Sequence, residues 1–264
     1  MKRLLLSLWN YRHFIVGSVK NEFRTRFIRS RLGAAWIVLH PLAQVLIYAL
    51  VLSQVMQAKL PGVDSQYAYP IYLLSGMVVW SLFAELLGRL LTVFIENANL
   101  LKKLAFPKLA LPLVSIGSSM VNFTLLLLAM YLVFAFLGHF PFRYILWLVP
   151  LISITLVLAV GIGLTLGILN VFVRDIGQVL TIVLQFWFWL TPIVYTIDIV
   201  PQKYRFLLHL NPLSSIVEGF QSVLVYERSP DILPMLYPAL FGLFMLGAGM
   251  WLFLRAKEEI TDVL

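Results

Sequence analysis

The chain lacks several residue sets on which common activities depend. It contains no cysteine, which excludes disulfide bonds, thiolate metal sites and a cysteine nucleophile. Its four histidines, His13, His40, His139 and His209, are scattered without metal-ligand spacing. A GxxxxGK[ST] phosphate loop, a GxSxG nucleophile elbow and a TVGYG-type potassium filter are also missing. We therefore expect no catalytic residues, no metal and no cofactor bound by this chain.

Charge is scarce as well. Charged residues make up 12% of the 264 residues, against about 25% in soluble domains, and the mean hydropathy is +0.92. Six uncharged runs are each about 20 residues or longer, enough for a helix to cross the hydrocarbon core. The sequence predicts one all-α polytopic membrane domain over 1–264, with spans at 33–57, 70–93, 111–137, 145–171, 178–197 and 233–254.

The basic residues are distributed unevenly between the two sides that six spans would create. An even number of spans places both termini on one side, which receives eight Lys and Arg residues from the arm 1–32. Lys102, Lys103 and Lys108 fall on the same side, between the second and third spans. The positive-inside rule then predicts cytoplasmic termini in an inner (plasma) membrane protein. The net charge of +8 indicates topology and contact with membrane lipids, and we expect no nucleic-acid partner.

Two basic segments have the character of membrane-surface helices. In 20–32, Phe23, Phe27 and Ile28 share one helical face, which is typical of an interface helix. This segment is either a generic amphipathic anchor or a surface for a cytoplasmic partner. In the loop 96–108, Asn97 is expected to cap a short helix that Pro107 ends.

The apolar residues of that short helix allow two interpretations. Leu100, Leu101 and Leu104 form a stripe that could enter a groove on another protein. Alternatively, 96–108 is an ordinary connection whose lysines set the topology.

Within the external segment 198–230, Phe206–Leu208 and Ser215–Tyr226 are too apolar for a solvated loop and too short to span. Such stretches usually enter the membrane part-way, where irregular backbone must lie against protein or a water-filled cavity. Asn211-Pro212 divides the segment in two. We predict re-entrant helices that form a gate, with Pro192, Tyr195, Asn211 and Pro212 as gate residues.

Two rows of polar and aromatic residues run along predicted spans. Polar groups within spans are costly unless they face protein or water. Rings combined with amides and hydroxyls suit the passage of an uncharged, hydroxyl-rich chain, although helix–helix packing would also explain them. The first row is Trp36, His40, Gln44 and Tyr48, and the second is Gln178, Thr181, Gln185 and Trp189.

Other residues within the spans are better explained by packing. Gly163 and Gly167 form a GxxxG pattern that favours close helix contact. Glu85 and Arg89 lie four residues apart and are expected to pair.

Several short motifs, in order from residue 20 to residue 226, resemble landmarks of polysaccharide-exporting ABC permeases of the type-2 class. They resemble O-antigen exporters most, and capsule and teichoic acid exporters share most of them. The motifs are Glu22-Phe23-Arg24-Thr25-Arg26-Phe27, Arg31-Leu32-Gly33-Ala34-Ala35-Trp36 with His40-Pro41, Asn99-Leu100-Leu101-Lys102-Lys103 with Phe106-Pro107, Arg174-Asp175-Ile176-Gly177-Gln178, Leu190-Thr191-Pro192-Ile193-Val194-Tyr195 and Asn211-Pro212-Leu213.

This resemblance implies a homodimer bound to two copies of a separate ATPase subunit, which would use ATP and Mg. It implies a lipid-linked polysaccharide substrate, typically carried on undecaprenyl diphosphate. The interface helix 20–32 and the coupling helix 97–106 would dock on the ATPase. The coupling residues would be Asn97, Asn99, Leu100, Leu101, Lys102, Lys103, Phe106 and Pro107.

Four arginines of the interface segment are candidates for binding the lipid diphosphate: Arg24, Arg26, Arg29 and Arg31. Guanidinium groups bind phosphate well. Contact with the ATPase or with anionic lipid is the competing interpretation for each of them.

Three alternative functions fit parts of the pattern. An ABC exporter of a drug or small lipid would share the architecture with a less aromatic passage. A stand-alone channel or secondary carrier would work without an ATPase, although the spans offer no buried carboxylate besides Glu85 for proton coupling. A membrane-embedded glycan-modifying enzyme would lose its product chemistry on a single histidine or acidic substitution.

Overall fold

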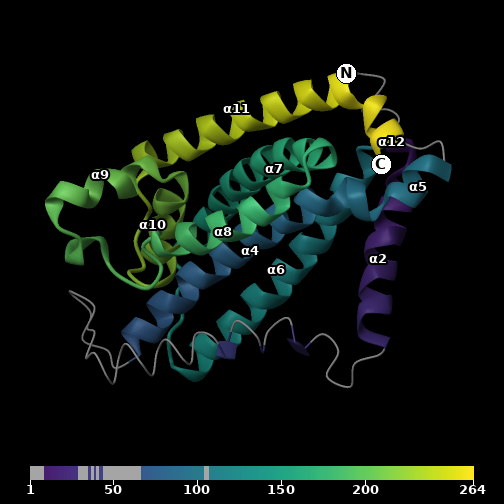
Figure 1. Ribbon diagram of the computed structural model, residues 1–264. Helices are drawn as coiled ribbons and strands as arrows, with labels where there is room; N and C mark the ends of the chain where they lie inside the picture. The colour runs from purple at the N-terminus through teal and green to yellow at the C-terminus, as the bar shows by residue number, and fades with distance from the viewer. Residues whose placement is uncertain (1–8, 29–34, 37–38, 40–41, 44–66, 104–106) are drawn as a thin grey trace.

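The computed structural model describes residues 9–28, 35–36, 39, 42–43, 67–103 and 107–264, and within these ranges every regular element is helical (Figure 1). The elements are α2 (Arg12–Ile28), α4 (Ala68–Glu96), α5 (Ala98–Lys103), α6 (Ala110–Phe136), η2 (Ile145–Trp147), α7 (Leu148–Phe172), α8 (Asp175–Trp189), η3 (Ile197–Ile199), α9 (Gln202–Leu210), α10 (Pro212–Leu224), α11 (Ile232–Ala256) and α12 (Glu259–Val263).

Four helical stretches of the described chain are long and apolar enough to cross a membrane: Ala68–Glu96, Ala110–Phe136, Ile145–Phe172 and Ile232–Ala256. They coincide with the predicted spans 70–93, 111–137, 145–171 and 233–254 to within three residues at each end. Most of the predicted span 33–57 lies outside the described residues. The predicted all-helical membrane class is confirmed for this part of the chain.

The span predicted at 178–197 is wrong over its second half, because the helix does not continue to residue 197. The helix α8 ends at Trp189, and the chain then turns through residues 190–196. Pro192 explains the end, because proline lacks a backbone donor and disfavours helical geometry in the residue before it. With 15 residues, α8 is shorter than the other four stretches.

The helix α4 forms the middle of the bundle. It packs against α6, α7, α8 and α10, and much of its surface is buried on all sides. Leu73, Phe83, Leu86 and Leu87 have no exposed surface at all. A helix that is apolar around its whole circumference is stable where neighbours surround it, and α4 meets that condition.

Glycines allow the closest helix contacts. A Cβ atom added to Gly242 of α11 would lie 2.9 Å from the backbone of Leu158 in α7, and one added to Gly161 would lie 2.6 Å from the Leu246 nitrogen. Gly167 approaches α4 in the same way, with a hypothetical Cβ 2.2 Å from the Leu90 carbonyl oxygen. The packing predicted for the Gly163 and Gly167 pattern is therefore confirmed.

Short helices gather at the two ends of the bundle (Figure 1). At one end, here called the α5 end, α5 and α12 pack around a second apolar cluster that includes Phe94, Ile168 and Phe253. At the opposite end, the α10 end, α9 and α10 follow the 190–196 turn. The bundle thus presents two differently built ends.

We expect Gly242→Ala to destabilise the protein by about 1–3 kcal/mol, because the added methyl group would overlap the α7 backbone. Thermal unfolding in detergent would measure the loss. Gly247→Ala is the matched control, because Gly247 lies in the same helix with nothing within 4 Å of its hypothetical Cβ. Equal melting temperatures for the two variants would contradict the close contact.

Candidate functional site

The second predicted row lies on an uncovered helix. Of the 15 residues of α8, only Leu180 and Phe188 are buried. Phe188 packs edge-on against Trp80 of α4 at 5.3 Å between ring centroids, which holds α8 on the bundle. All four predicted residues of the row, Gln178, Thr181, Gln185 and Trp189, are exposed.

The two amides of this row have unused hydrogen-bonding capacity. Thr181 donates its hydroxyl proton to the Gly177 carbonyl at 3.0 Å. The side-chain amides of Gln178 and Gln185 have no hydrogen-bond partner within the part of the chain described. Trp189 is 57% exposed beside them. This face of α8 offers donors, acceptors and an indole ring to whatever lies against it.

The first predicted row is represented by Trp36, which is 54% exposed. His40, Gln44 and Tyr48 lie outside the described residues. The pairing of the two rows along one passage therefore stays a prediction.

The 190–196 turn is buried and tied to the start of α4. The Tyr69 hydroxyl donates to the Val194 carbonyl at 2.6 Å. The Tyr72 hydroxyl lies 3.2 Å from the Pro192 carbonyl and 3.0 Å from the Tyr195 carbonyl. On the other side, the Gln221 amide of α10 donates to the Pro192 carbonyl at 3.1 Å. Both neighbouring helices thus hold this turn through its backbone.

Asn211 connects three elements at the same end. Its Oδ1 accepts from Trp187 Nε1 at 2.8 Å and from the Leu213 backbone, which caps α10. Its Nδ2 donates to the Leu190 carbonyl and, at 2.9 Å, to the Thr191 hydroxyl. Pro212 follows as the first residue of α10, where a missing backbone donor costs nothing.

Three of the predicted gate residues therefore meet at this end: Pro192 and Tyr195 in the turn, and Asn211 against it. The tyrosines of α4 and Gln221 were missed at the sequence level. The only available signal was a glutamine in an otherwise apolar stretch and two tyrosines three residues apart.

The coupling segment differs from its prediction in two details. The Asn97 side chain does not cap α5 but donates back to the Val93 carbonyl of α4 at 2.8 Å, because Asn97 also ends that helix. Leu101 is buried in the cluster at the α5 end, so it is not available to a partner. Asn99, Lys102 and Lys103 are the exposed residues of α5. Phe106 lies outside the described residues, and Pro107 is half-buried beyond them.

The interface helix is longer than predicted. It begins at Arg12 rather than near Lys20, and α2 packs along α6. Arg24 is exposed, and Arg26 lies in the last turn of the helix. Arg29 and Arg31 lie outside the described residues.

An ion-pair network fastens α2 to the bundle. Arg89 of α4 pairs with Glu22 of α2, a residue 67 positions away in the sequence. Ser118 of α6 donates to the other Glu22 oxygen at 2.6 Å. One glutamate of α2 therefore contacts two helices of the bundle.

The same arginine completes the pair predicted within α4. Arg89 Nε lies 3.0 Å from Glu85 Oε1, which confirms that prediction. The same oxygen accepts from Asn122 at 2.6 Å and from Ser119 at 3.1 Å, both on α6. Charges within a span persist only when they are paired in this way.

Residues 15–225 match the family described as ABC-2 type transporter. The chain belongs to this family. It is similar to two proteins named O-antigen export system permease protein RfbA. That of Myxococcus xanthus is 26% identical over 264 residues, covering 99% of both chains. That of Klebsiella pneumoniae is 27% identical over 253 residues, covering 95% of this chain and 94% of the relative.

A relative named for polysialic acid transport matches as well. The polysialic acid transport protein KpsM of Escherichia coli is 26% identical over 243 residues, covering 90% of this chain and 91% of the relative. The similarity to polysaccharide-exporting permeases suggested by the short motifs is confirmed. The chain matches these relatives over 90–99% of its length.

We expect Arg89→Met to lower the stability of the permease, because it leaves the Glu22 and Glu85 carboxylates without their shared cation. The cost should be about 1–3 kcal/mol, since all three side chains are partly exposed. Thermal unfolding in detergent would measure it, with Arg174→Met on an exposed position as the control.

A double-mutant cycle tests the specific pair. Glu22→Gln should cost less in the Arg89→Met background than in the parent chain. Strictly additive losses would mean that the two side chains do not interact.

Proposed function

We propose that this chain is the transmembrane permease subunit of an ATP-driven exporter of a lipid-linked polysaccharide, with O-antigen on undecaprenyl diphosphate as the substrate. The observation that carries this proposal is the uncovered polar and aromatic face of α8, in a chain similar over nearly its whole length to permeases named for O-antigen export. Aromatic rings and amides suit a hydroxyl-rich polymer that must slide without binding tightly.

In this proposal the subunit has six spans and functions as a homodimer. The segment 33–57 is the first span and α8 the fifth, and both termini are cytoplasmic in the inner membrane. Two copies facing each other would cover the α8 surfaces and enclose a passage between them. A polar face in lipid would be unfavourable, whereas the same face around a hydrated polymer is stable.

The partner is a separate ATPase, present in two copies, which uses ATP and Mg. It would dock at the α5 end, where Lys102 and Lys103 are exposed. Because Leu101 is packed inside the subunit, a push on α5 reaches the bundle directly. Through the Glu22–Arg89 pair, a push on α2 would likewise be transmitted to α4. Closure of the ATPase would thereby separate the two halves of the dimer.

The arginines of the interface segment meet the lipid carrier in this arrangement. Arg24 and Arg26, followed by Arg29 and Arg31, would lie at the level of the cytoplasmic headgroups. There guanidinium groups can bind a diphosphate. At the opposite end, the 190–196 turn with α9 and α10 would form the external gate.

A capsular polysaccharide is the second candidate substrate. It is favoured by the similarity to the polysialic acid transport protein, which extends over 90% of this chain.

Co-purification from the native membrane tests the exporter class. Tagged protein should bring down an equimolar subunit with a phosphate loop, and replacing both Lys102 and Lys103 with glutamate should reduce its recovery. Isolation of the permease alone, stable and without an ATPase, would overturn the coupling assignments and favour a channel or carrier.

Substitutions in the two rows test the passage. Trp36→Ala, Tyr48→Ala and Trp189→Ala should each slow polymer export while leaving the amount of assembled complex unchanged, because each removes a ring from the passage wall. Surface polysaccharide per assembled complex is the measurement. Leu240→Ala, at an exposed apolar position of α11, is the control. Unchanged export in the triple variant would contradict the assignment.

A further inference from the structure

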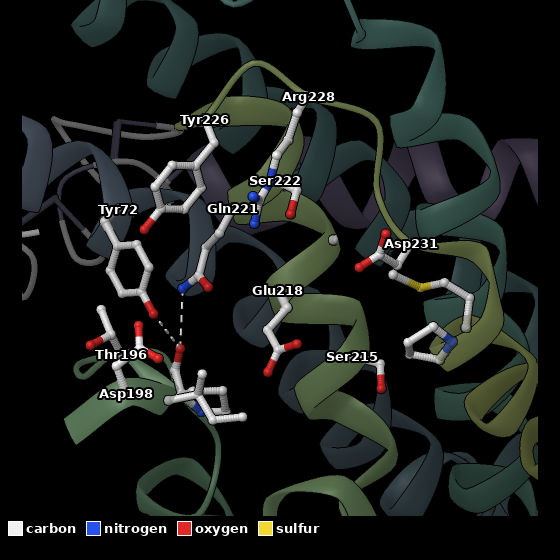
Figure 2. Close-up of a pocket in the computed structure, with 15 residues that line it drawn as sticks. Tyr72, Thr196, Asp198, Ser215, Glu218, Gln221, Ser222, Tyr226, Arg228 and Asp231 are labelled. Carbon is white, nitrogen blue, oxygen red and sulfur yellow. Dashed lines mark hydrogen bonds between the residues drawn. The ribbon is translucent and has the colours of Figure 1, made fainter. Parts of the chain in front are cut away.

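A cavity of about 170 Å³ opens at the α10 end, beside the 190–196 turn. It lies between the start of α4, the segment 192–198, α10 and the beginning of α11 (Figure 2). Figure 2 shows Glu218 of α10 extending into the space that Tyr72, Gln221 and Ser215 surround. None of the described row residues, Trp36, Gln178, Thr181, Gln185 and Trp189, lines it. The cavity is separate from the α8 face.

The carboxylates that line this cavity have no direct partner in the described part of the protein. Within the described part of the chain, the carboxylates of Glu218, Asp198 and Asp231 make no hydrogen bond or ion pair. The Arg228 guanidinium lies 5.0 Å from the Tyr226 ring centroid and likewise has no carboxylate partner there. Water solvates the exposed side chains of Asp198, Arg228 and Asp231, so a desolvation cost arises only at the half-buried Glu218.

Partial burial affects the Glu218 carboxyl group directly. Burial raises the pKa of its carboxyl group, the nearby Asp231 raises it further, and His209 opposes the change. A ligand that donated hydrogen bonds to this carboxylate would relieve the penalty.

The chemistry of the lining selects among ligand classes. Among the described residues no group of three or more histidines, aspartates and glutamates could hold a metal ion. Three carboxylates disfavour a phosphate or another anion. An apolar ligand would leave the carboxylates and the Arg228 guanidinium without hydrogen-bond partners. A sugar ring satisfies all of them, since its hydroxyls donate to carboxylates, accept from guanidinium and amide groups, and its C–H face packs on tyrosine.

The size of the cavity favours a single ring over an oligosaccharide. Pockets for drug-sized ligands range from about 300 to 1,000 Å³, and this one is smaller.

The occupant would touch the residues that hold the 190–196 turn. Tyr72 and Gln221 line the cavity, and both bind the Pro192 carbonyl. Thr196, at the end of the turn, lines it as well. A ligand bound in the cavity would therefore contact the proposed gate directly.

We propose that this cavity binds one sugar residue of the exported glycan on the external side of the gate. The inference rests on the proposed function and adds to it a second glycan contact outside the α8 passage. A bound sugar would hold the emerging polysaccharide beside the turn. Because Tyr72 and Gln221 would contact this sugar and also bind the Pro192 carbonyl, the presence of polymer would affect the position of Pro192.

The absence of cysteine from the chain permits a direct test by single-cysteine labelling. Ser215→Cys places the only thiol in the cavity, with Ser222→Cys as a second lining position. Gln185→Cys reports on the α8 face. Gln202→Cys, exposed on α9 outside the cavity lining, is the control. The rate of reaction with N-ethylmaleimide is compared in intact cells that do or do not synthesise the polymer, using only variants that retain export.

Polymer synthesis should slow labelling at the cavity positions and at Gln185→Cys but leave Gln202→Cys unchanged. Slowing at Gln185→Cys alone would overturn the cavity proposal and leave the proposed function standing. No slowing at any position would overturn both.

Glu218→Gln separates ligand binding from simple crowding by polymer. It preserves the shape of the side chain and removes the charge, so the protection at Ser215→Cys should weaken by about tenfold, the value of one hydrogen bond to a charged group. Protection at Gln185→Cys should not change. Undiminished protection at Ser215→Cys in the Glu218→Gln variant would overturn the assignment of the site.

Discussion

The structure depends on close backbone contact between helices that have no apolar driving force to associate. In a hydrocarbon environment, lipid chains are as apolar as leucine, so helices associate through packing and interhelical polar contacts. Gly242 and Gly161 let α11 and α7 approach each other, and Gly167 brings α7 against the Leu90 carbonyl of α4. Because α4 packs against α5, α6, α7, α8 and α10, it fixes the positions of these helices relative to one another.

Polar contacts on α4 then connect the two ends of the bundle. Toward the α5 end, Arg89 binds the interface helix through Glu22. At the α10 end, Tyr69 and Tyr72 hold the 190–196 turn through its carbonyl oxygens. Both sets of contacts are on one continuous helix. In the proposed exporter, this helix connects the ATPase side with the external gate.

Much of the architecture could be predicted locally. Hydropathy located the four long helices to within a few residues, and the GxxxG pattern and the Glu85–Arg89 pair were recognised from spacing alone. The errors arose where two local signals competed. Asn97 ends α4 as well as preceding α5, and its side chain serves the first helix. The apolar run that contains α8 continues past Pro192, but the helix itself ends at Trp189.

The membrane class, the long helices, the break at Asn211-Pro212 and the similarity to polysaccharide exporters could all be read from the amino-acid sequence. These properties reside in about 20 consecutive residues at a time, where composition and periodicity decide the outcome. The pairing of Glu22 with Arg89, the burial of Leu101 and the place of Glu218 in a cavity beside the turn follow from the folded arrangement of the helices. Each of these depends on which sides of distant helices meet, and hydropathy carries no information about that choice.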